Sequence, residues 1–468
     1  MGRLAHIVRV LRHRDFRYLW LAQSFSVVGD FVALVALSLY VIQRTGDPTD
    51  LGIVLAAQSL PLAAFLLIGG VWADRLPRHR VMVATDLVRF TLHALLAALV
   101  FAGVARIWHL VAIEAVFGAA EAFFRPAATG LLPQTVPEPE IQRASALTGL
   151  SENVAEFAGP ALATALVLGL GAGWAFALDA ATFLLSAAFL WRVRPRRRVP
   201  QPQPDPAPVC APAAGRAGAP GAGQAGVPAA APQGASATAP VRAPGRWAGV
   251  WSELREGARE VGSRAWVWGT LASFCVALFA GLATWFVLGP SIAREQYGGV
   301  GVYGLVSAAL GVGTIAGSLI GSGWRPRHPM RAAMLAILIW PAADVLYAAG
   351  VTLGVVIPAT VMAGGGVALF NVWWETALAE RIPPDKLSRV SSYDWMVSIA
   401  LLPLGYALAG PLAQAFGDVE VLLGGSALAL LALAAGLLPR ETRMLERLER
   451  PALAPGTGAI GSSIPYRP

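Results

Sequence analysis

The sequence predicts an all-α integral membrane protein whose twelve transmembrane helices form two pseudo-symmetric six-helix bundles. Composition is the first reason, because 56% of the 468 residues are hydrophobic and only 14% are charged, which is too few charges for soluble domains of this size. The apolar residues also fall into runs of about 20, the length that crosses a bilayer as a helix. Finally, residues recur between the two halves of the chain, which indicates a duplicated bundle.

The expected membrane spans follow one another with short gaps. They are residues 18–42, 51–73, 81–102, 107–131, 144–168 and 172–191 in the first half, and 266–292, 300–323, 332–349, 353–378, 390–416 and 419–438 in the second. The expected division of the chain is a cytoplasmic N-terminus at 1–17, an N-terminal bundle at 18–192, a linker at 193–246, an amphipathic helix at 247–264, a C-terminal bundle at 265–439 and a cytoplasmic tail at 440–468. The linker is rich in Pro, Ala and Gly and is expected to be disordered, whereas the amphipathic helix should lie on the membrane surface.

The duplication is visible in individual residues. Phe124 matches Phe370 at one constant offset, and Gly52 matches Gly304 at a second. Two parallel halves of this kind define one transporter design, in which the substrate site lies between the halves near the middle of the membrane.

Basic residues orient the chain. Most of the 36 lysines and arginines lie in loops on the same side as both termini, whereas Arg44, Arg106 and Arg294 lie on the other side. The positive-inside rule therefore predicts cytoplasmic termini and a location in the cell membrane. Because the net charge of +8 is divided among these loops rather than gathered on one face, we expect no nucleic-acid partner.

Several kinds of chemistry are not expected. Cys210 lies in the linker, Cys275 lies in a span, and the six histidines have no metal-ligand spacing. The chain has no phosphate-binding Gly-x-x-x-x-Gly-Lys-Ser/Thr loop and no recognisable set of nucleophile, base and metal ligands. We therefore expect no metal, no cofactor and no enzymatic activity, and an ion gradient rather than ATP as the energy source.

The loop between the second and third spans carries the most informative motif, Gly-x-x-x-Asp-Arg-x-x-Arg-x-Arg. Its members are Gly70, Asp74, Arg75, Arg78 and Arg80. Glycine lets another helix approach closely, and the aspartate can accept hydrogen bonds from the free N–H groups of a neighbouring helix. We expect Asp74 to latch the second helix against the start of the eleventh, near residues 388–394, in the outward-facing state. A basic loop that only orients the chain is the alternative.

This loop resembles the signature between helices 2 and 3 of the major facilitator superfamily, although Pro77 stands where a second glycine is usual. Other motifs are similar to the branch that holds enterobactin-type siderophore exporters and macrolide exporters. They are Leu19-Trp20-x-x-Gln23, Gly29-Asp30, Phe124-x-Pro126-Ala127, Gly159-Pro160, Asn371-x-x-Trp374-Glu375 and residues 404–411. The resemblance covers nearly all of the chain outside the linker and tails. It implies the major facilitator fold, rocking of two bundles with alternating access, and export coupled to the proton gradient.

Two motifs are expected to allow bending and close packing of helices, because proline lacks an N–H and glycine lacks a side chain. They are Gly159-Pro160 and Gly410-Pro411. The first resembles the antiporter signature of the superfamily only in part, because Ala163 and Thr164 replace its usual glycines.

Polar residues within the spans are the candidates for proton coupling and substrate binding, because a charge in the hydrocarbon is costly unless it is paired or faces water. They are Asp30, Glu121, Arg125, Glu152, Glu156, Asn371 and Glu375. Asp30, about halfway along the first span, is the leading candidate, since a proton and a cationic substrate could compete for its carboxylate. Helix packing is the alternative for Asp30, and a structural ion pair is the alternative for Glu121 and Arg125, which are four residues apart.

Other acidic residues are left outside the expected site. Glu114 stands where many members of the family have an arginine, which leaves the part of the fourth helix in proton handling open. Asp179, Asp344 and Asp394 lie nearer the ends of spans, where water or a helix cap usually satisfies a carboxylate.

We therefore expect a monomeric secondary active transporter that exports a hydrophobic or amphiphilic small molecule, such as a drug, antibiotic or siderophore, in exchange for protons. Its expected partners are the substrate, protons and the lipid bilayer. The same scaffold permits uptake, or the flipping of a lipid or siderophore, and a transport-dead membrane sensor is a further alternative.

Overall fold

The computed structural model describes residues 9–73, 76–195, 259, 261–324, 326–382 and 400–447, with residues 390, 393–394 and 396–398 in addition. The side chains of residues 67–73, 138 and 157 are not described. Most of the expected linker, most of the expected surface helix at 247–264 and the tail beyond residue 447 therefore lie outside the described residues. Within the described residues, all regular structure is helical.

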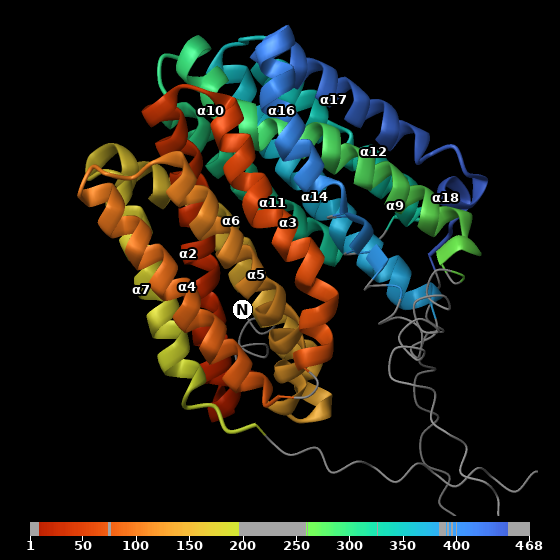
Figure 1. Cartoon of the computed structure of the whole chain (residues 1–468). Helices are drawn as coiled ribbons and strands as arrows, with labels where there is room; N and C mark the ends of the chain where they lie inside the picture. Colours follow the sequence, from red (N-terminus) through yellow and green to blue (C-terminus); the bar gives the residue numbers. More distant parts are fainter. Residues whose placement is uncertain are drawn as a thin grey trace, which may run out of the picture.

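The first half contains six long helices (Figure 1). They are α2 (Arg14–Thr45), α3 (Pro48–Ala73), α4 (Arg78–Phe101), α5 (Ile107–Leu131), α6 (Ile141–Gly169) and α7 (Ala172–Leu190). A short helix, η1 (Arg9–Arg12), precedes them, and η2 (Leu132–Gln134) and η3 (Glu138–Glu140) connect α5 to α6.

The second half repeats this order with more interruptions. α9 (Ala265–Ala277), the π-helical turn η4 (Leu278–Leu282) and α10 (Ala283–Gln296) follow without a break. The next elements are α11 (Gly301–Gly323), α12 (Pro329–Ile337), α13 (Ile339–Ala348), α14 (Leu353–Arg381), α16 (Leu402–Phe416), α17 (Asp418–Ala435) and the short α18 (Arg440–Met444).

Among the described residues, eleven helices are long and apolar enough to cross a membrane. Each corresponds to one of the twelve expected spans. The remaining expected span, 144–168, is occupied by α6, which has 29 residues but carries Arg143, Glu152, Asn153 and Glu156. These polar residues lower the hydropathy of α6, so its membrane-spanning character is not established by composition alone.

In the part of the chain that the structure describes, six glycines with positive φ reveal the duplication in the backbone. They form three matched pairs, each at the same helix–helix connection in the two halves: Gly46 and Gly298, Gly103 and Gly350, and Gly171 and Gly417. Their φ angles also agree within each pair, at 71° and 77°, 71° and 67°, and 100° and 100°. A residue with a Cβ rarely adopts this conformation, so glycine lets the chain reverse tightly at each of these connections. All six turns lie at one end of the molecule, called here the glycine-turn end.

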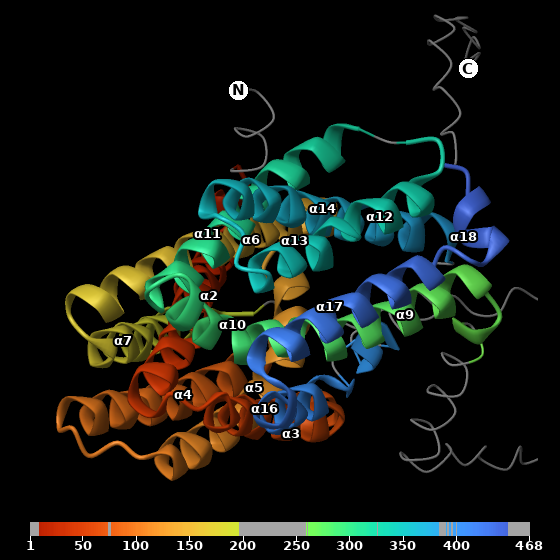
Figure 2. The ribbon, with the colours of Figure 1, turned by 90° about the horizontal axis from the view of Figure 1, so that it is seen from above.

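The two halves lie side by side and meet along two seams. Seen from above, α6 runs beside α11 and α3 runs beside α16 (Figure 2). The close contacts concentrate at the glycine-turn end: Gly304 packs on Thr164, and Gly410 packs on the backbone of Thr49. A Cβ on either glycine would overlap its neighbour, so the absence of a side chain lets the halves touch there.

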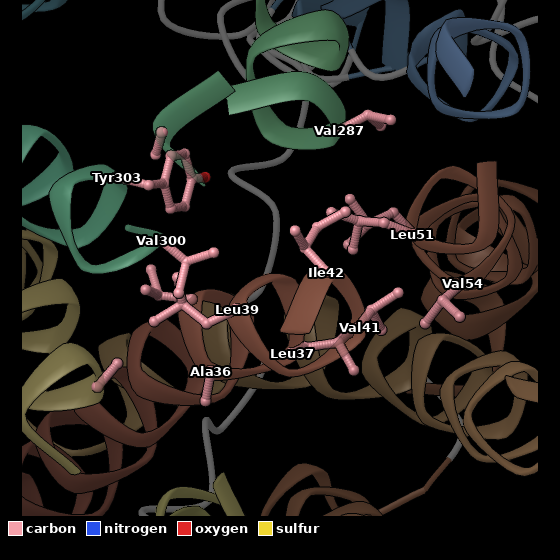
Figure 3. Packing of buried hydrophobic residues seen from close by; sticks show 14 of the residues in the cluster. Ala36, Leu37, Leu39, Val41, Ile42, Leu51, Val54, Val287, Val300 and Tyr303 are labelled. Carbon is pink, nitrogen blue, oxygen red and sulfur yellow. The ribbon is translucent and has the colours of Figure 1, made fainter. Parts of the chain in front are cut away.

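Among the described residues, the hydrophobic core also connects the two halves at the glycine-turn end and not toward the opposite end. One buried cluster joins the halves at the glycine-turn end, with Leu39 and Ile42 of α2 facing Val287 of α10 and Tyr303 of α11 (Figure 3). The other three clusters each belong to a single half. Toward the opposite end the ribbons of the two halves diverge (Figure 1). Apolar packing therefore seals the molecule at the glycine-turn end.

Candidate functional site

Asp30 lies at the middle of α2, as expected, and about a third of its side chain (36%) is exposed. Its nearest charged partner is Arg89 of α4, whose Nη1 lies 4.0 Å from Asp30 Oδ1. This separation gives an ion-pair contact without a direct hydrogen bond. The carboxyl group is therefore held beside a buried cation while part of it still reaches solvent.

Glu121 and Arg125 form the ion pair that their spacing on α5 suggests. Arg125 donates to Glu121 Oε1 from Nε at 2.8 Å and from Nη2 at 2.5 Å. Arg125 also interacts electrostatically with Asp30 and with Glu152 of α6. The pair is thus not an isolated helical salt bridge, because it stands between the carboxylates of two other helices.

Charged groups of the two halves face each other across the α6 region. Glu152 is exposed and interacts electrostatically with Arg125 on its own half and with Glu375 of α14 on the other. Asn371, one turn before Glu375, is exposed as well. Glu156 lies one turn beyond Glu152 and is half-buried. The structure thus brings Asp30, Glu121 and Glu152 within electrostatic range of Arg125 and places Glu375 as a like charge opposite Glu152, an arrangement called here the electrostatic chain, with Glu156 and Asn371 beside it.

A buried arginine on α4 belongs to this region, although it was not predicted as a site residue from the sequence. Arg89 is only 1% exposed, donates to Asp86 Oδ1 at 2.5 Å, and lies over the rings of Phe124 and Phe183 at 4.1 Å and 4.5 Å. Ser186 of α7 donates to the other carboxylate oxygen of Asp86 at 2.6 Å. Asp86 and Arg89 therefore form a fully buried pair that reaches toward Asp30.

A second buried group surrounds His93, one turn further along α4. Its Nδ1 is hydrogen-bonded to Asp179 of α7, and its Nε2 lies 3.6 Å from Glu114 of α5. The expectation that Asp179 would be satisfied by water or a cap at a span end is wrong, because its side chain is 0% exposed and is bound by His93. The spacing of Asp86, Arg89 and His93 on one face of α4 was a readable signal. Their partners on α5 and α7 were not readable.

Of the expected residues in the loop between the second and third spans, some lie within the described part of the chain and some do not. Arg78, at the start of α4, donates to the carbonyl oxygen of Gly130 at 2.5 Å, and Arg80 is exposed. Gly70 lies in the last part of α3. Asp74 and Arg75 lie outside the described residues, as does most of the expected partner segment at 388–394. The latch therefore remains a prediction.

The two Gly-Pro motifs lie inside continuous helices. α6 runs through Gly159 and Pro160, and Gly159 packs against Phe31 of α2. In α16, Gly410 packs against Thr49 of α3, next to Pro411. The glycines thus serve close helix packing, within the first half in one case and between the halves in the other.

No group of three or more His, Cys, Asp or Glu residues in the described part of the chain could hold a metal ion. The His93 cluster consists of three ionisable groups, of which His93 and Asp179 are hydrogen-bonded and Glu114 lies 3.6 Å from the imidazole. Ionisable groups of this kind, like Asp30 and the Glu121–Arg125 pair, are chemically able to bind protons and charged ligands.

Helical spans in two similar halves, with charged side chains between them, are the architecture of a multi-pass membrane transporter. A family model described as Major Facilitator Superfamily matches residues 19–398. The chain belongs to this superfamily.

A characterised relative and an uncharacterised one are each similar in sequence to part of this chain. An uncharacterized MFS-type transporter, YfiS of Bacillus subtilis (strain 168), is 28% identical over 171 residues, which are 36% of this chain and 40% of that protein. Macrolide efflux protein A of Streptococcus pyogenes is 24% identical over 151 residues, 32% of this chain and 37% of that protein. The matched segments thus span about two fifths of these relatives.

Solved structures share the fold at low identity. The nucleoside transporter NupG superposes with a TM-score of 0.61 at 11% identity, covering 91% of this chain and 98% of that one. A bacterial homolog of the human lysosomal transporter Spinster gives 0.63 at 14% identity, covering 93% and 98%. A POT family transporter gives 0.65 at 12% identity, covering 91% and 96%. These likenesses establish the fold alone.

Proposed function

We propose that the protein exports a hydrophobic or amphiphilic small molecule in exchange for protons. The observation that carries this proposal is the electrostatic chain from Asp30 through Arg125 and Glu152 to Glu375, which joins four helices and both halves. Ionisable groups at this depth are expensive and usually belong to an ion or substrate pathway. A sensor that moves no substrate has no need of such a chain.

Asp30 is the group for which proton and substrate compete. It is the carboxyl group that is both partly exposed and next to a buried cation, Arg89. A bound proton neutralises Asp30 and leaves Arg89 to its pair with Asp86, whereas an ionised Asp30 attracts a cationic group of the substrate. Binding of one ligand therefore disfavours the other, which is the requirement for exchange.

The asymmetric contact between the halves supports alternating access. The halves are sealed by apolar packing at the glycine-turn end and diverge toward the other end. If the basic loops and termini face the cytoplasm, the glycine-turn end is external and the structure is the state that is open to the cytoplasm. Rocking about the α3–α16 and α6–α11 seams would then open the external end.

The direction and the substrate class rest on the partial likeness to a macrolide efflux protein. A macrolide is large and amphiphilic, and a site between two helical bundles with few polar groups suits such a ligand. Uptake by the same scaffold is the competing direction, because fold alone does not set direction.

Asp30→Asn tests the coupling. Inside-out vesicles that hold the protein are given an imposed pH gradient, and uptake of a radiolabelled macrolide and of ethidium is measured. We expect wild-type uptake to collapse when the gradient is dissipated, and Asp30→Asn to lose at least tenfold of the gradient-driven rate while keeping its membrane insertion. Glu295→Gln, at the exposed end of α10, is the matched acid-to-amide control.

Two results would contradict the proposal, and each would exclude a different part of it. Gradient-driven uptake at the wild-type rate in Asp30→Asn removes Asp30 from the mechanism. If wild-type uptake does not depend on the pH gradient, the protein does not exchange its substrate for protons.

The Asp74 latch is a separate part of the proposed cycle. Asp74→Ala should slow transport and shift the protein toward the state that is open to the cytoplasm, because the latch is proposed to hold the other state. Normal transport with unchanged cysteine accessibility at the glycine-turn end would eliminate the latch.

A further inference from the structure

The His93 cluster is enclosed on every side. The side chains of His93, Asp179 and Glu114 are 2%, 0% and 3% exposed. The imidazole stacks on Phe117 at 4.4 Å and meets the edge of Phe183 at 5.9 Å. Its Nδ1 is bonded to Asp179, whereas its Nε2 has no hydrogen-bond partner within the described residues. Three ionisable groups from α4, α5 and α7 are thus held together away from water.

The charges of this cluster do not balance when all of its acids are ionised. Asp86 and Arg89 on α4 balance each other. If His93 is charged, the ionised forms of Asp179 and Glu114 still leave one negative charge without a partner. An unpaired buried charge is strongly disfavoured, so the cluster offers a place for one proton. The cluster therefore changes by one proton between its neutral and its charged forms.

Asp30 connects this cluster to solvent. Gly29, its neighbour on α2, lies where a Cβ would overlap Asp179 Oδ1 and Thr182 Oγ1 of α7. The missing side chain lets Asp179 press against α2, where it interacts electrostatically with Asp30. The charged groups that face His93 are therefore Asp179 from α7 and Glu114 from α5, with Arg89 one turn away on α4 and Asp30 of α2 one step further. Among these acids, Asp30 alone is substantially exposed.

We propose that His93, Asp179 and Glu114 form a second proton-binding site, which exchanges its proton with solvent through Asp30 and adds one proton to each transport cycle. The proposal rests on the proposed proton-coupled function. In the exchange step, the proton leaves the Asp30 carboxyl group and is accepted by the Asp179 carboxylate, and Asp30 is then ionised beside Arg89. His93 shares the accepted proton through the Nδ1 contact. The imidazole is therefore a positioning residue that stabilises the proton on the cluster.

Infrared spectroscopy tests the site without any substrate. Difference spectra between acidic and alkaline buffer are recorded on the full chain in lipid, and the carboxylic-acid C=O stretching bands are counted. We expect a titrating band that is lost or shifted in Asp179→Asn and in Glu114→Gln, and we expect this band to respond more slowly to a pH jump in Asp30→Asn, because the proposed exchange passes through Asp30. Titrating bands that are the same in the wild type, Asp179→Asn and Glu114→Gln would overturn the second site.

Transport stoichiometry provides the functional test. Protons exchanged per ethidium molecule are measured in vesicles from the pH gradient that balances a known dye gradient. His93→Gln should lower the ratio by about one, and His109→Gln, a histidine at the start of α5, should keep the wild-type ratio. An unchanged ratio in His93→Gln would overturn the proposal.

A double variant separates a proton site from a packing role. His93→Gln combined with Asp179→Asn retains a hydrogen-bonded neutral pair in the same place. If the cluster only packs helices, this variant should recover the wild-type ratio, which would overturn the proposal; a folded variant with the reduced ratio supports it. If wild-type efflux proves independent of protons, the proposed function fails, and the infrared bands still decide whether the second site exists.

Discussion

Gln414 of α16 donates a hydrogen bond from Nε2 to Asp47 Oδ2, 3.1 Å away, across the seam between the two halves. The same Nε2 lies 2.9 Å from Thr49 Oγ1. One amide thus ties the start of α3 to the second half. The nearby guanidinium of Arg294 donates to the carbonyl oxygen of Ile42 at 3.2 Å, which adds a second polar link at the glycine-turn end.

Gln414→Glu should weaken this closure, because it places a carboxylate against Asp47. Two like charges about 4 Å apart in water repel by about 1 kcal/mol, which corresponds to roughly a fivefold shift toward the open state. The measurement is the rate at which a membrane-impermeant maleimide labels Leu51→Cys in a background where Cys210 and Cys275 are replaced by serine. Leu51 is 0% exposed in the closed arrangement. Equal labelling rates with and without the Gln414→Glu substitution would show that this link does not govern closure.

Gly52→Ala and Gly410→Ala should both prevent tight closure at the same end. A Cβ at Gly52 would overlap the carbonyl oxygen of Tyr406, and one at Gly410 would overlap the backbone of Thr49. Overpacking of this kind typically costs about 1–3 kcal/mol, so we expect at least a fivefold faster labelling of Leu51→Cys and slower transport. Gly424→Ala is the control, because a Cβ there meets nothing within 4 Å. Normal transport in both seam variants would contradict the closure described above.

Arg89→Met should be among the most destabilising single changes in the first half. It leaves Asp86 without its cation at 0% exposure, and breaking a buried pair in this way costs about 3–5 kcal/mol. Adding Asp86→Leu should recover much of that loss, because the fully buried carboxylate is then gone, whereas Asp30, the other partner of Arg89, is partly exposed to solvent. Unfolding free energies in mixed detergent micelles check the cycle. If the double variant is as unstable as Arg89→Met, the ring contacts of Arg89 rather than its charge hold the helices together.

The contact between η1 and η3 should depend on pH. Glu140 accepts from Arg12, and its Oε2 lies 2.7 Å from His13 Nε2. Burial raises the pKa of Glu140, but the hydrogen bond with His13 and the charge of Arg12 outweigh burial and hold the pKa below its usual 4.5. The contact therefore stabilises the fold above pH 4.5 and is lost as the pH falls through the depressed folded-state pKa.

Hydrogen–deuterium exchange of residues 9–12, corrected for the intrinsic pH dependence, measures this contact. Protection should persist from neutral pH down to the usual glutamate pKa of 4.5 in the wild type and be reduced at every pH in Glu140→Gln. Protection that is unaffected by Glu140→Gln would mean that Val10 and Phe16, which pack in the same small cluster, hold η1 alone.

The sequence predicted only some residues of the candidate site. There is a physical reason why it predicted these and not the others. Asp30 is recognisable because a lone acid in the middle of an apolar run is costly, and Glu121 with Arg125 is recognisable because their spacing puts them on one helix face. Arg89 and His93 stand at equally regular positions on α4. Their meaning depends on Asp179 and Glu114, which belong to other helices, and no local pattern specifies which side chains meet across a bundle.

Sequence patterns alone predicted the order of the helices, the duplication and the superfamily, and eleven of the twelve expected spans are long and apolar enough to cross a membrane among the described residues. Runs of apolar residues and glycines at the turns act locally, so they can be read in order along the chain. The folded structure was needed to show that the halves close at the glycine-turn end, that the polar helix α6 lies at a seam, and that Asp179 is buried against His93. These features arise from packing between helices that are distant in sequence, where close approach depends on the shape and charge of both partners.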